Sequence, residues 1–194
     1  MGQECMRLFV ALNLPAEIKG KLALAQAGLP DGAARKTGAD AMHATLFFLG
    51  EVDEGKVAGI CESLREAAGG IGETPGRMGA FHVSVFGVGA FPNERKPRVV
   101  WAGVQGEGLH GLATAVQHAL EKIGFKPDKP FSGHITIARV REGAPPDLAG
   151  FFDKFRGEKF GGFEADCFEL MKSTLLPSGP KYEAVASFRL QGQV

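Results

Sequence analysis

The sequence contains little that would support a secreted, membrane-bound or zinc-binding protein. Only three cysteines occur in 194 residues; Cys5, Cys61 and Cys167 lie far apart, and no C-x-x-C pair is present. This argues against a disulfide framework or a thiolate zinc site and fits a reducing compartment. No apolar run approaches the about 20 residues that span a bilayer, and the N-terminus lacks a secretory signal. We therefore expect a cytoplasmic protein that does not associate with membranes.

An excess of charge of either sign is also absent. Lysine and arginine together number 22, as do aspartate and glutamate, so the formal net charge is zero. Proteins that coat long nucleic acids or anionic membranes need an excess of positive charge, and this balance argues against both. A small anionic ligand held by a few local groups stays possible. No cluster of His, Asp and Glu has metal-ligand spacing, and we expect neither a metal nor a cofactor.

The hydrophobic pattern alternates between strand-like and helix-like segments. Buried or alternating apolar runs predict strands, which fall at residues 6–12, 43–49, 81–88, 98–104, 134–140, 163–175 and 182–190. Apolar residues at helical spacing predict helices at residues 15–27, 53–68 and 107–123, with a shorter one between 147 and 155. Residues 31–40 are predicted to be a loop, and residues 177–179 a turn between the last two strands. The order indicates an α+β fold with mainly antiparallel sheets, and residues 1–194 form a single domain.

A short motif occurs twice in the chain. His43-Ala44-Thr45-Leu46 is matched by His134-Ile135-Thr136-Ile137, at a separation of 134 − 43 = 91 residues, close to half the chain. Each copy opens an apolar strand and is preceded by a strand and a helix. The repeat predicts two pseudo-symmetric lobes, each contributing one strand to a shared central cleft.

The spacing within each motif places the polar side chains together. Residues two apart on a strand project from the same face, so His43 accompanies Thr45 and His134 accompanies Thr136. Two imidazoles and two hydroxyls suit in-line displacement at phosphorus: one histidine accepts a proton from the attacking oxygen and the other donates one to the leaving oxygen. The hydroxyls donate to the non-bridging oxygens. This symmetry does not distinguish the acid from the base.

Either motif alone is weak, because a single H-x-T on a strand is more often a packed histidine than a catalyst. The longer set of matching segments is more specific. The chain resembles the 2H phosphoesterase superfamily, and within it the RNA 2′,3′-cyclic phosphodiesterases, also called 2′-5′ RNA ligases. The segments that carry this resemblance are residues 6–11, 42–51, 89–92, 97–101, 130–139 and 176–182. Two positions depart from the family pattern: Gly133 replaces a frequent proline, which would loosen the start of that strand, and residues 35–41 lack a tryptophan.

The resemblance implies the reaction and the roles of the residues. A terminal 2′,3′-cyclic phosphate on RNA would be opened to a 2′-phosphate, with His43 as general acid and His134 as general base. Thr45 and Thr136 would hold the phosphate. An arginine at position 139 would bind it too, although strict alternation places Arg139 on the opposite face from His134 unless a bulge intervenes. The partners would be RNA 3′ ends or nucleoside 2′,3′-cyclic phosphates, and we expect a monomer.

Other candidates and rival functions stay open from the sequence. Arg7 and Lys129 are weaker anion-binding candidates, while Arg95, Lys96 and Arg98 are more simply interpreted as a solvated loop than as a rim for RNA. A 2′-5′ RNA ligase, in which a 5′-hydroxyl replaces water, would use the same site in reverse. A non-catalytic module that binds nucleotides or RNA ends is the rival from another class, but such a module needs no proton-transfer groups.

Overall fold

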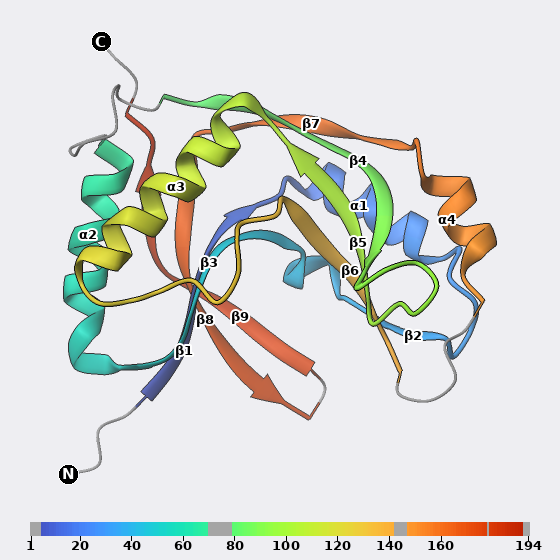
Figure 1. Ribbon diagram of the computed structural model, residues 1–194, viewed down its shortest axis with the longest axis horizontal. Coiled ribbons are helices and arrows are strands. Elements are labelled where there is room, and N and C mark those ends of the chain that lie inside the picture. Colours follow the sequence, from blue (N-terminus) through green and yellow to red (C-terminus); the bar gives the residue numbers. More distant parts are fainter. Residues whose placement is uncertain (1–4, 70–78, 142–146, 178, 192–194) are drawn as a thin grey trace.

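A curled antiparallel sheet forms the centre of the molecule (Figure 1). The computed structural model describes residues 5–69, 79–141, 147–177 and 179–191. Within these ranges the strands are β1 (Cys5–Asn13), β2 (Ala34–Lys36), β3 (His43–Asp53), β4 (Phe81–Phe91), β5 (Val99–Gln105), β6 (His134–Val140), β7 (Lys159–Ala165), β8 (Cys167–Leu176) and β9 (Gly179–Arg189). Their order is β7-β4-β5-β6-β3-β1-β8-β9, with β2 paired to β6. The predicted α+β class is therefore confirmed.

The sheet divides into two lobes of four strands. β3, β1, β8 and β9 form one lobe, and β6, β5, β4 and β7 form the other. In the described strands the two lobes are joined through a single backbone pair, Ala44 opposite Ile135. β3 and β6 diverge beyond this pair, and β2 extends the second lobe there by pairing with β6.

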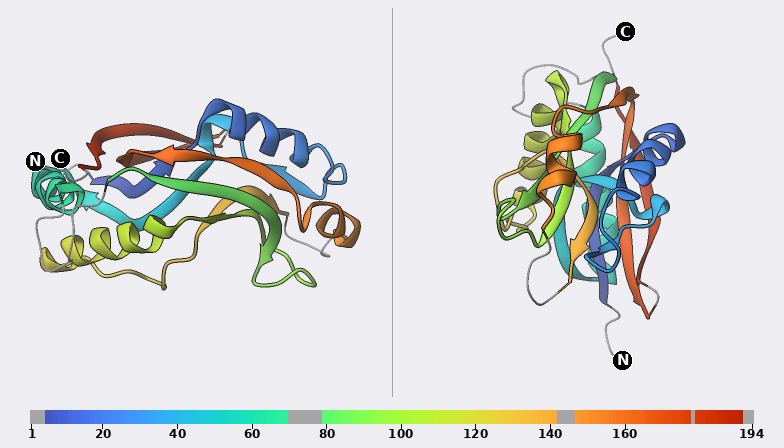
Figure 2. Two further views of the ribbon diagram at one scale, coloured as in Figure 1. Left: turned by 90° about the horizontal axis from the view of Figure 1, so that it is seen from above. Right: turned by 90° about the vertical axis from the view of Figure 1, so that its right-hand side faces the viewer.

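Helices cover the sheet at several places. They are α1 (Ala16–Gln26), α2 (Val57–Gly69), α3 (Glu107–Lys122) and α4 (Ala149–Phe155), with short 3₁₀ turns η1 (Ala39–Ala41) and η2 (Glu54–Lys56). α2 and α3 lie side by side at one end of an elongated molecule, and α4 lies at the other end (Figure 2). Within the described chain, no helix has the length and apolar character needed to cross a membrane.

The helix patterns form the core as predicted. The apolar stripe of α3 is buried, and it packs with the buried side chains of Ile60 and Leu64 from α2 and with β-strand residues such as Ile135. Gly124, the residue directly after the predicted helix at 107–123, has a φ of +93°, a conformation that L side chains rarely adopt. Asp53, the last residue of β3, caps η2, where its carboxylate accepts a hydrogen bond from the Gly55 amide at 2.9 Å.

The two halves repeat the same unit. β1–α1–β3 and β5–α3–β6 are both strand–helix–strand units, and the two strands of each unit pair antiparallel. The first seven residues of β3 and all seven of β6 share one alternation of partly buried, buried and exposed positions. This match extends the two four-residue motifs over a whole strand each.

Two predicted segments were assigned wrongly. Residues 163–175 form two strands, because the chain leaves β7 beside β4, turns at Asp166 and enters β8 beside β1 in the other lobe. The Asp166 carbonyl accepts from Leu190 N at 2.7 Å at this crossing. No glycine or proline marks the break, so the apolar pattern continues through it.

The predicted loop at 31–40 contains β2 and η1. The Thr37 amide holds this segment to β6 by donating to the Ile137 carbonyl at 2.8 Å. Ser178, in the predicted turn, lies outside the described residues.

Candidate active site

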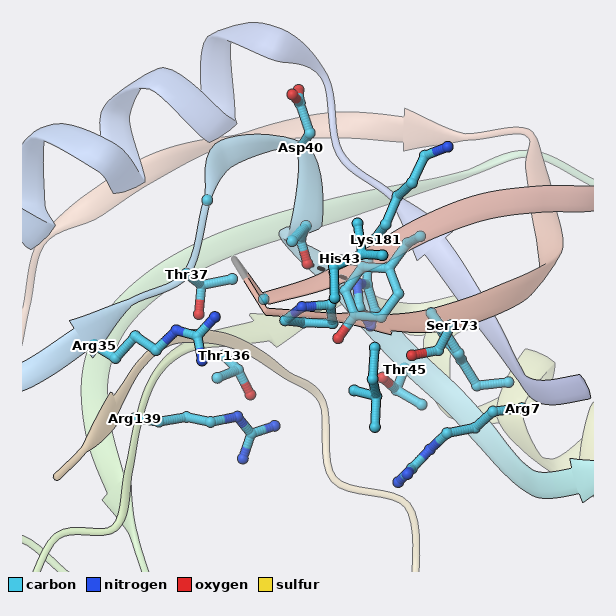
Figure 3. Close-up of a pocket in the computed structure, with 18 of the residues that line it drawn as sticks. Arg7, Arg35, Thr37, Asp40, His43, Thr45, Thr136, Arg139, Ser173 and Lys181 are labelled. Atoms are coloured by element: carbon cyan, nitrogen blue, oxygen red, sulfur yellow. Dashed lines mark hydrogen bonds between the residues drawn. The ribbon is translucent and has the colours of Figure 1, made fainter. Parts of the chain in front are cut away.

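The two H-x-T motifs meet at the junction between the lobes. His43 is the first residue of β3 and His134 is the first of β6, and the inter-lobe backbone pair joins the residues that follow them. His43, Thr45, His134 and Thr136 all line one cavity of about 1150 Å³ (Figure 3). The structure thus places the four residues expected from the sequence in the walls of the same cavity.

Both imidazoles are fixed through the same ring nitrogen. His43 Nδ1 lies 2.9 Å from the Ala41 carbonyl, and His134 Nδ1 lies 2.8 Å from the Ser132 carbonyl. In each case the partner is two residues earlier in the chain. A carbonyl oxygen only accepts hydrogen bonds, so Nδ1 carries the hydrogen and Nε2 has the lone pair in the neutral ring. Each histidine therefore offers Nε2 for proton transfer.

Aromatic rings hold the two histidines in unequal surroundings. The His43 ring stacks on Phe9, with centroids 4.7 Å apart, and forms a T-shaped pair with Tyr182, with centroids 5.1 Å apart. His134 contacts Phe91 at 5.0 Å in an edge-on arrangement. His43 is thus enclosed by two rings from β1 and β9.

Burial keeps both histidines neutral in the ligand-free protein. It lowers the pKa of His43 to about 4, against a smaller opposing effect of the Ala41 hydrogen bond. The positive charge of Lys19 adds to the decrease, as does that of His134 when His134 is protonated. The pKa of His134 is also lowered, mainly by burial and further by Arg139, while the bond to Ser132 opposes this. An anion bound between the rings would favour their charged forms.

A bulge in β6 brings Arg139 into the cavity. Val100 of β5 pairs with Ala138, and the next β5 residue, Trp101, pairs with Thr136, so Ile137 is an extra residue in β6. Ile137 and Ala138 are consequently both buried, and Arg139 returns to the face of Thr136. Arg139 lines the cavity together with His134 and Thr136, so it lies on their face of β6 and not on the opposite face that strict alternation gives.

The equivalent bulge in β3 carries a different residue. Val10 pairs with Phe47 and Ala11 with Thr45, so Leu46 is the extra residue. Phe48 then occupies the position equivalent to Arg139. The guanidinium of Arg7, supplied by β1, lies 5.1 Å from the centre of the Phe48 ring, and both residues line the cavity. An arginine is therefore present on each side, from different strands.

Positive charge is concentrated around this cavity although the whole chain is neutral. Asp40 is the one acidic residue of the described lining, which includes six cationic side chains. These are Arg7, Arg35, Lys36, Lys129, Arg139 and Lys181. No three His, Cys, Asp or Glu side chains within the described ranges are grouped so that they could hold a metal ion. The cavity is suited to a ligand with several negative charges.

Several lining residues were not predicted from the sequence. Arg35 and Thr37 come from the segment predicted to be a loop, and Ser173, Lys181 and Tyr182 come from the β8–β9 hairpin. The sequence pattern predicted the turn of this hairpin, and the family resemblance included residues 176–182, but neither placed these side chains in the cavity.

Among the weaker candidates from the sequence, Arg7 and Lys129 do line the cavity, while Arg95, Lys96 and Arg98 are not part of the lining. The amides of Arg95 and Lys96 bind the Asn93 side chain in a turn.

Gly133 permits close contact between β5 and β6. A Cβ added there would collide with the Val104 carbonyl oxygen. The Val104 amide donates to the Gly133 carbonyl at 3.1 Å, which holds this residue to β5. Glycine is the residue that fits the space just before His134.

The comparison with known families agrees with this arrangement. The family described as LigT like Phosphoesterase matches residues 12–101 and 104–182, which together make up most of the chain. The chain belongs to the LigT-like phosphoesterase family. Both H-x-T motifs of this LigT-like protein lie within the matched residues.

Curated relatives of the LigT-like chain have one name in common. The chain is 40% identical over 185 residues to an RNA 2′,3′-cyclic phosphodiesterase of Archaeoglobus fulgidus, and the alignment covers 94% of this chain and 99% of the relative. A protein of the same name from Methanocaldococcus jannaschii is 32% identical over 181 residues, covering 93% and 98%.

Solved structures of the family share the fold. A crystal structure of a Thermus thermophilus protein has a TM-score of 0.80 at 31% identity and covers 97% of this chain and 100% of its own. Escherichia coli LigT complexed with 3′-AMP has a TM-score of 0.75 at 28% identity, covering 96% of this chain and 99% of that one.

Proposed function

We propose that this protein hydrolyses the terminal 2′,3′-cyclic phosphate of RNA to a 2′-phosphate by general acid–base catalysis with His43 and His134. The observation that carries the proposal is the matched pair of imidazoles, each with Nδ1 bound to a carbonyl and Nε2 left for substrate, in one cationic cavity. The names of the relatives support the substrate class.

The reaction requires one proton to be removed from water and one to be donated to the leaving O3′ atom. His134 Nε2 accepts a proton from water, whose oxygen attacks phosphorus. The bond from phosphorus to O3′ breaks, and protonated His43 Nε2 donates its proton to O3′, which leaves a 2′-phosphate and a 3′-hydroxyl. Thr45 and Thr136 donate hydrogen bonds to the non-bridging oxygens, and Arg139 neutralises charge that builds up on them.

The assignment of acid and base rests on the family resemblance. Burial favours neutral His134, as a general base requires. The same effect opposes protonation of His43, whose pKa is about 4 in the free protein. His43 therefore acts as an acid only when a bound phosphate raises its pKa again.

The unit that acts is one chain. Both histidines and both threonines of the cavity come from a single copy, so we propose a monomeric, two-lobed enzyme acting on RNA 3′ ends.

Ligation is the second candidate. A cavity of about 1150 Å³ is larger than the roughly 300–1,000 Å³ typical of small-molecule sites, and it leaves room for the 5′-hydroxyl of a second RNA end.

The decisive experiment is hydrolysis of adenosine 2′,3′-cyclic phosphate in the presence of EDTA, followed by phosphorus NMR. We expect a 2′-phosphate product, and loss of activity in both His43→Ala and His134→Ala. Full activity in either variant would exclude the two-histidine mechanism. A 3′-phosphate product would show that O2′ leaves instead. Incubation with tRNA halves tests ligation, with joined product as the positive result.

A further inference from the structure

Two arginines lie directly opposite one another at the edge of the cavity. Arg35 of β2 pairs with Arg139 of β6 in the antiparallel register. Residues opposed in this way project from the same face, and like charges in such positions repel. Both side chains line the cavity and extend into it in Figure 3. An anion bound at this edge would be attracted by both guanidinium groups.

Arg35 also reaches the opposite lobe. A Cβ added to Gly179, the first residue of β9, would collide with Arg35 Nη2. Gly179 has a φ of +133°, which L side chains rarely adopt, so glycine is suited to this position. The guanidinium of Arg35 therefore lies between β2 of one lobe and the β8–β9 hairpin of the other.

The charge around the cavity exceeds what one cyclic phosphate requires. A 2′,3′-cyclic phosphate diester carries a single negative charge, and the proposed reaction already places Thr45, Thr136 and Arg139 around it. The lining has six cationic side chains and one carboxylate. Each further nucleotide of an RNA strand adds one phosphate, so the surplus matches an oligonucleotide better than a mononucleotide.

We propose that Arg35 forms a second anion subsite, which binds the phosphate on the 5′ side of the terminal nucleoside. This inference rests on the proposed function and deepens it, because it makes the enzyme selective for RNA ends over free nucleoside cyclic phosphates. The guanidinium offers a planar fork of donors that matches two phosphate oxygens, which a lysine does not.

Three substrates separate this subsite from the reacting centre. They are adenosine 2′,3′-cyclic phosphate, the same compound with a 5′-phosphate, and the dinucleotide ApA with a terminal 2′,3′-cyclic phosphate. The 5′-phosphate alone should raise kcat/KM about tenfold in the wild type, and the second base should add less. In Arg35→Gln the gain from the 5′-phosphate should disappear, while kcat/KM for the simplest substrate falls less than about threefold.

Two further variants provide the controls, one that removes an equal charge elsewhere and one that keeps the charge at position 35. Arg141→Gln removes an exposed arginine that is not in the cavity lining, and it should keep the gain from the 5′-phosphate. Arg35→Lys should retain only part of it. The slope of log Kd against log salt for the dinucleotide product should change by about 0.7 in Arg35→Gln, as expected for one lost phosphate contact on a single strand.

The outcomes distinguish this inference from the proposed function. The inference is overturned if Arg35→Gln lowers activity equally on all three substrates, since Arg35 would then serve the reacting phosphate. It is also overturned if the gain persists in Arg35→Gln or depends only on the second base. If the wild type hydrolyses none of the substrates, the proposed function fails. The Kd values of 2′-phosphate products with and without a 5′-phosphate then still decide the role of Arg35.

Discussion

The carboxamide of Gln26 donates a hydrogen bond to the carbonyl of Ile137, the extra residue in the β6 bulge. Gln26 lies on α1, is 4% exposed, and also donates to the Thr37 carbonyl at 2.8 Å. A single buried side chain thus ties the segment before His43 to the bulge that follows Thr136. Both motifs of the cavity depend on backbone held by this residue.

Replacing Gln26 by leucine should therefore affect stability and catalysis together. The variant loses two hydrogen bonds to carbonyls in a buried or partly buried setting, and we expect a decrease of about 1–3 kcal/mol in the free energy of unfolding. We also expect kcat to fall more than KM rises, because Thr136 and His43 lose their relative positions. Urea unfolding and steady-state kinetics measure the two effects. A stable variant with unchanged kcat would show that Gln26 has no positioning role.

The stability of the protein should decrease in mild acid because of His43. Its pKa is 6.5 in the reference state and about 4 in the folded protein, so the unfolded chain binds a proton over this range while the folded chain does not. The contribution of neutral His43 to the free energy of unfolding is fully present above pH 6.5 and is lost as the pH falls toward 4. Between pH 7.5 and 5 the loss attributable to His43 is about 2 kcal/mol.

This effect is tested by urea unfolding of His43→Asn at both pH values. The variant should lose about 2 kcal/mol less than the wild type between them, and His134 should account for a further part in the same direction. His118→Asn, which removes an exposed histidine of α3, is the control and should behave as the wild type. Equal acid sensitivity in the wild type and in His43→Asn would contradict the assignment.

The repeated motif was predictable from sequence because it depends on local order alone. The alternation of side chains placed each histidine with its threonine. The residues that bind the two Nδ1 atoms, Ala41 and Ser132, are separated by the same 91 residues as the histidines. The face of Arg139 was not predictable, because the bulge at Ile137 is defined by the register with β5. Arg35 could not be placed either, since β2 exists only through its pairing with β6.

Anion binding should become tighter as the pH falls. Both histidines are neutral in the free protein because burial lowers their pKa values, and a bound anion favours the protonated forms. Binding is therefore coupled to proton uptake, with a limit of about tenfold in affinity per pH unit for each proton bound. Sulfate is a suitable probe because its charge is constant between about pH 5.5 and 7.5.

Isothermal titration with sulfate across this range measures the coupling directly. The pH dependence should be reduced in His43→Asn and in His134→Asn. Asp40 is the acidic residue of the described lining, so Asp40→Asn serves as the control and should retain it. A sulfate affinity that is constant with pH in the wild type would show that the imidazoles do not sense the bound anion.

Gly133 should be intolerant of even a small side chain. A methyl group at this position would collide with the Val104 carbonyl oxygen, which is backbone and cannot rotate away. Gly133→Ala should therefore push β6 from β5 at the residue before His134, destabilise the fold and lower kcat. By contrast, no heavy atom outside its immediate surroundings lies within 4 Å of a Cβ added to Gly20 in α1. Gly20→Ala should stabilise the protein by about 0.5–1 kcal/mol and leave kcat unchanged. If thermal unfolding and kinetics show the two alanine variants to be equivalent, the close approach of β5 and β6 at Gly133 is not what positions His134.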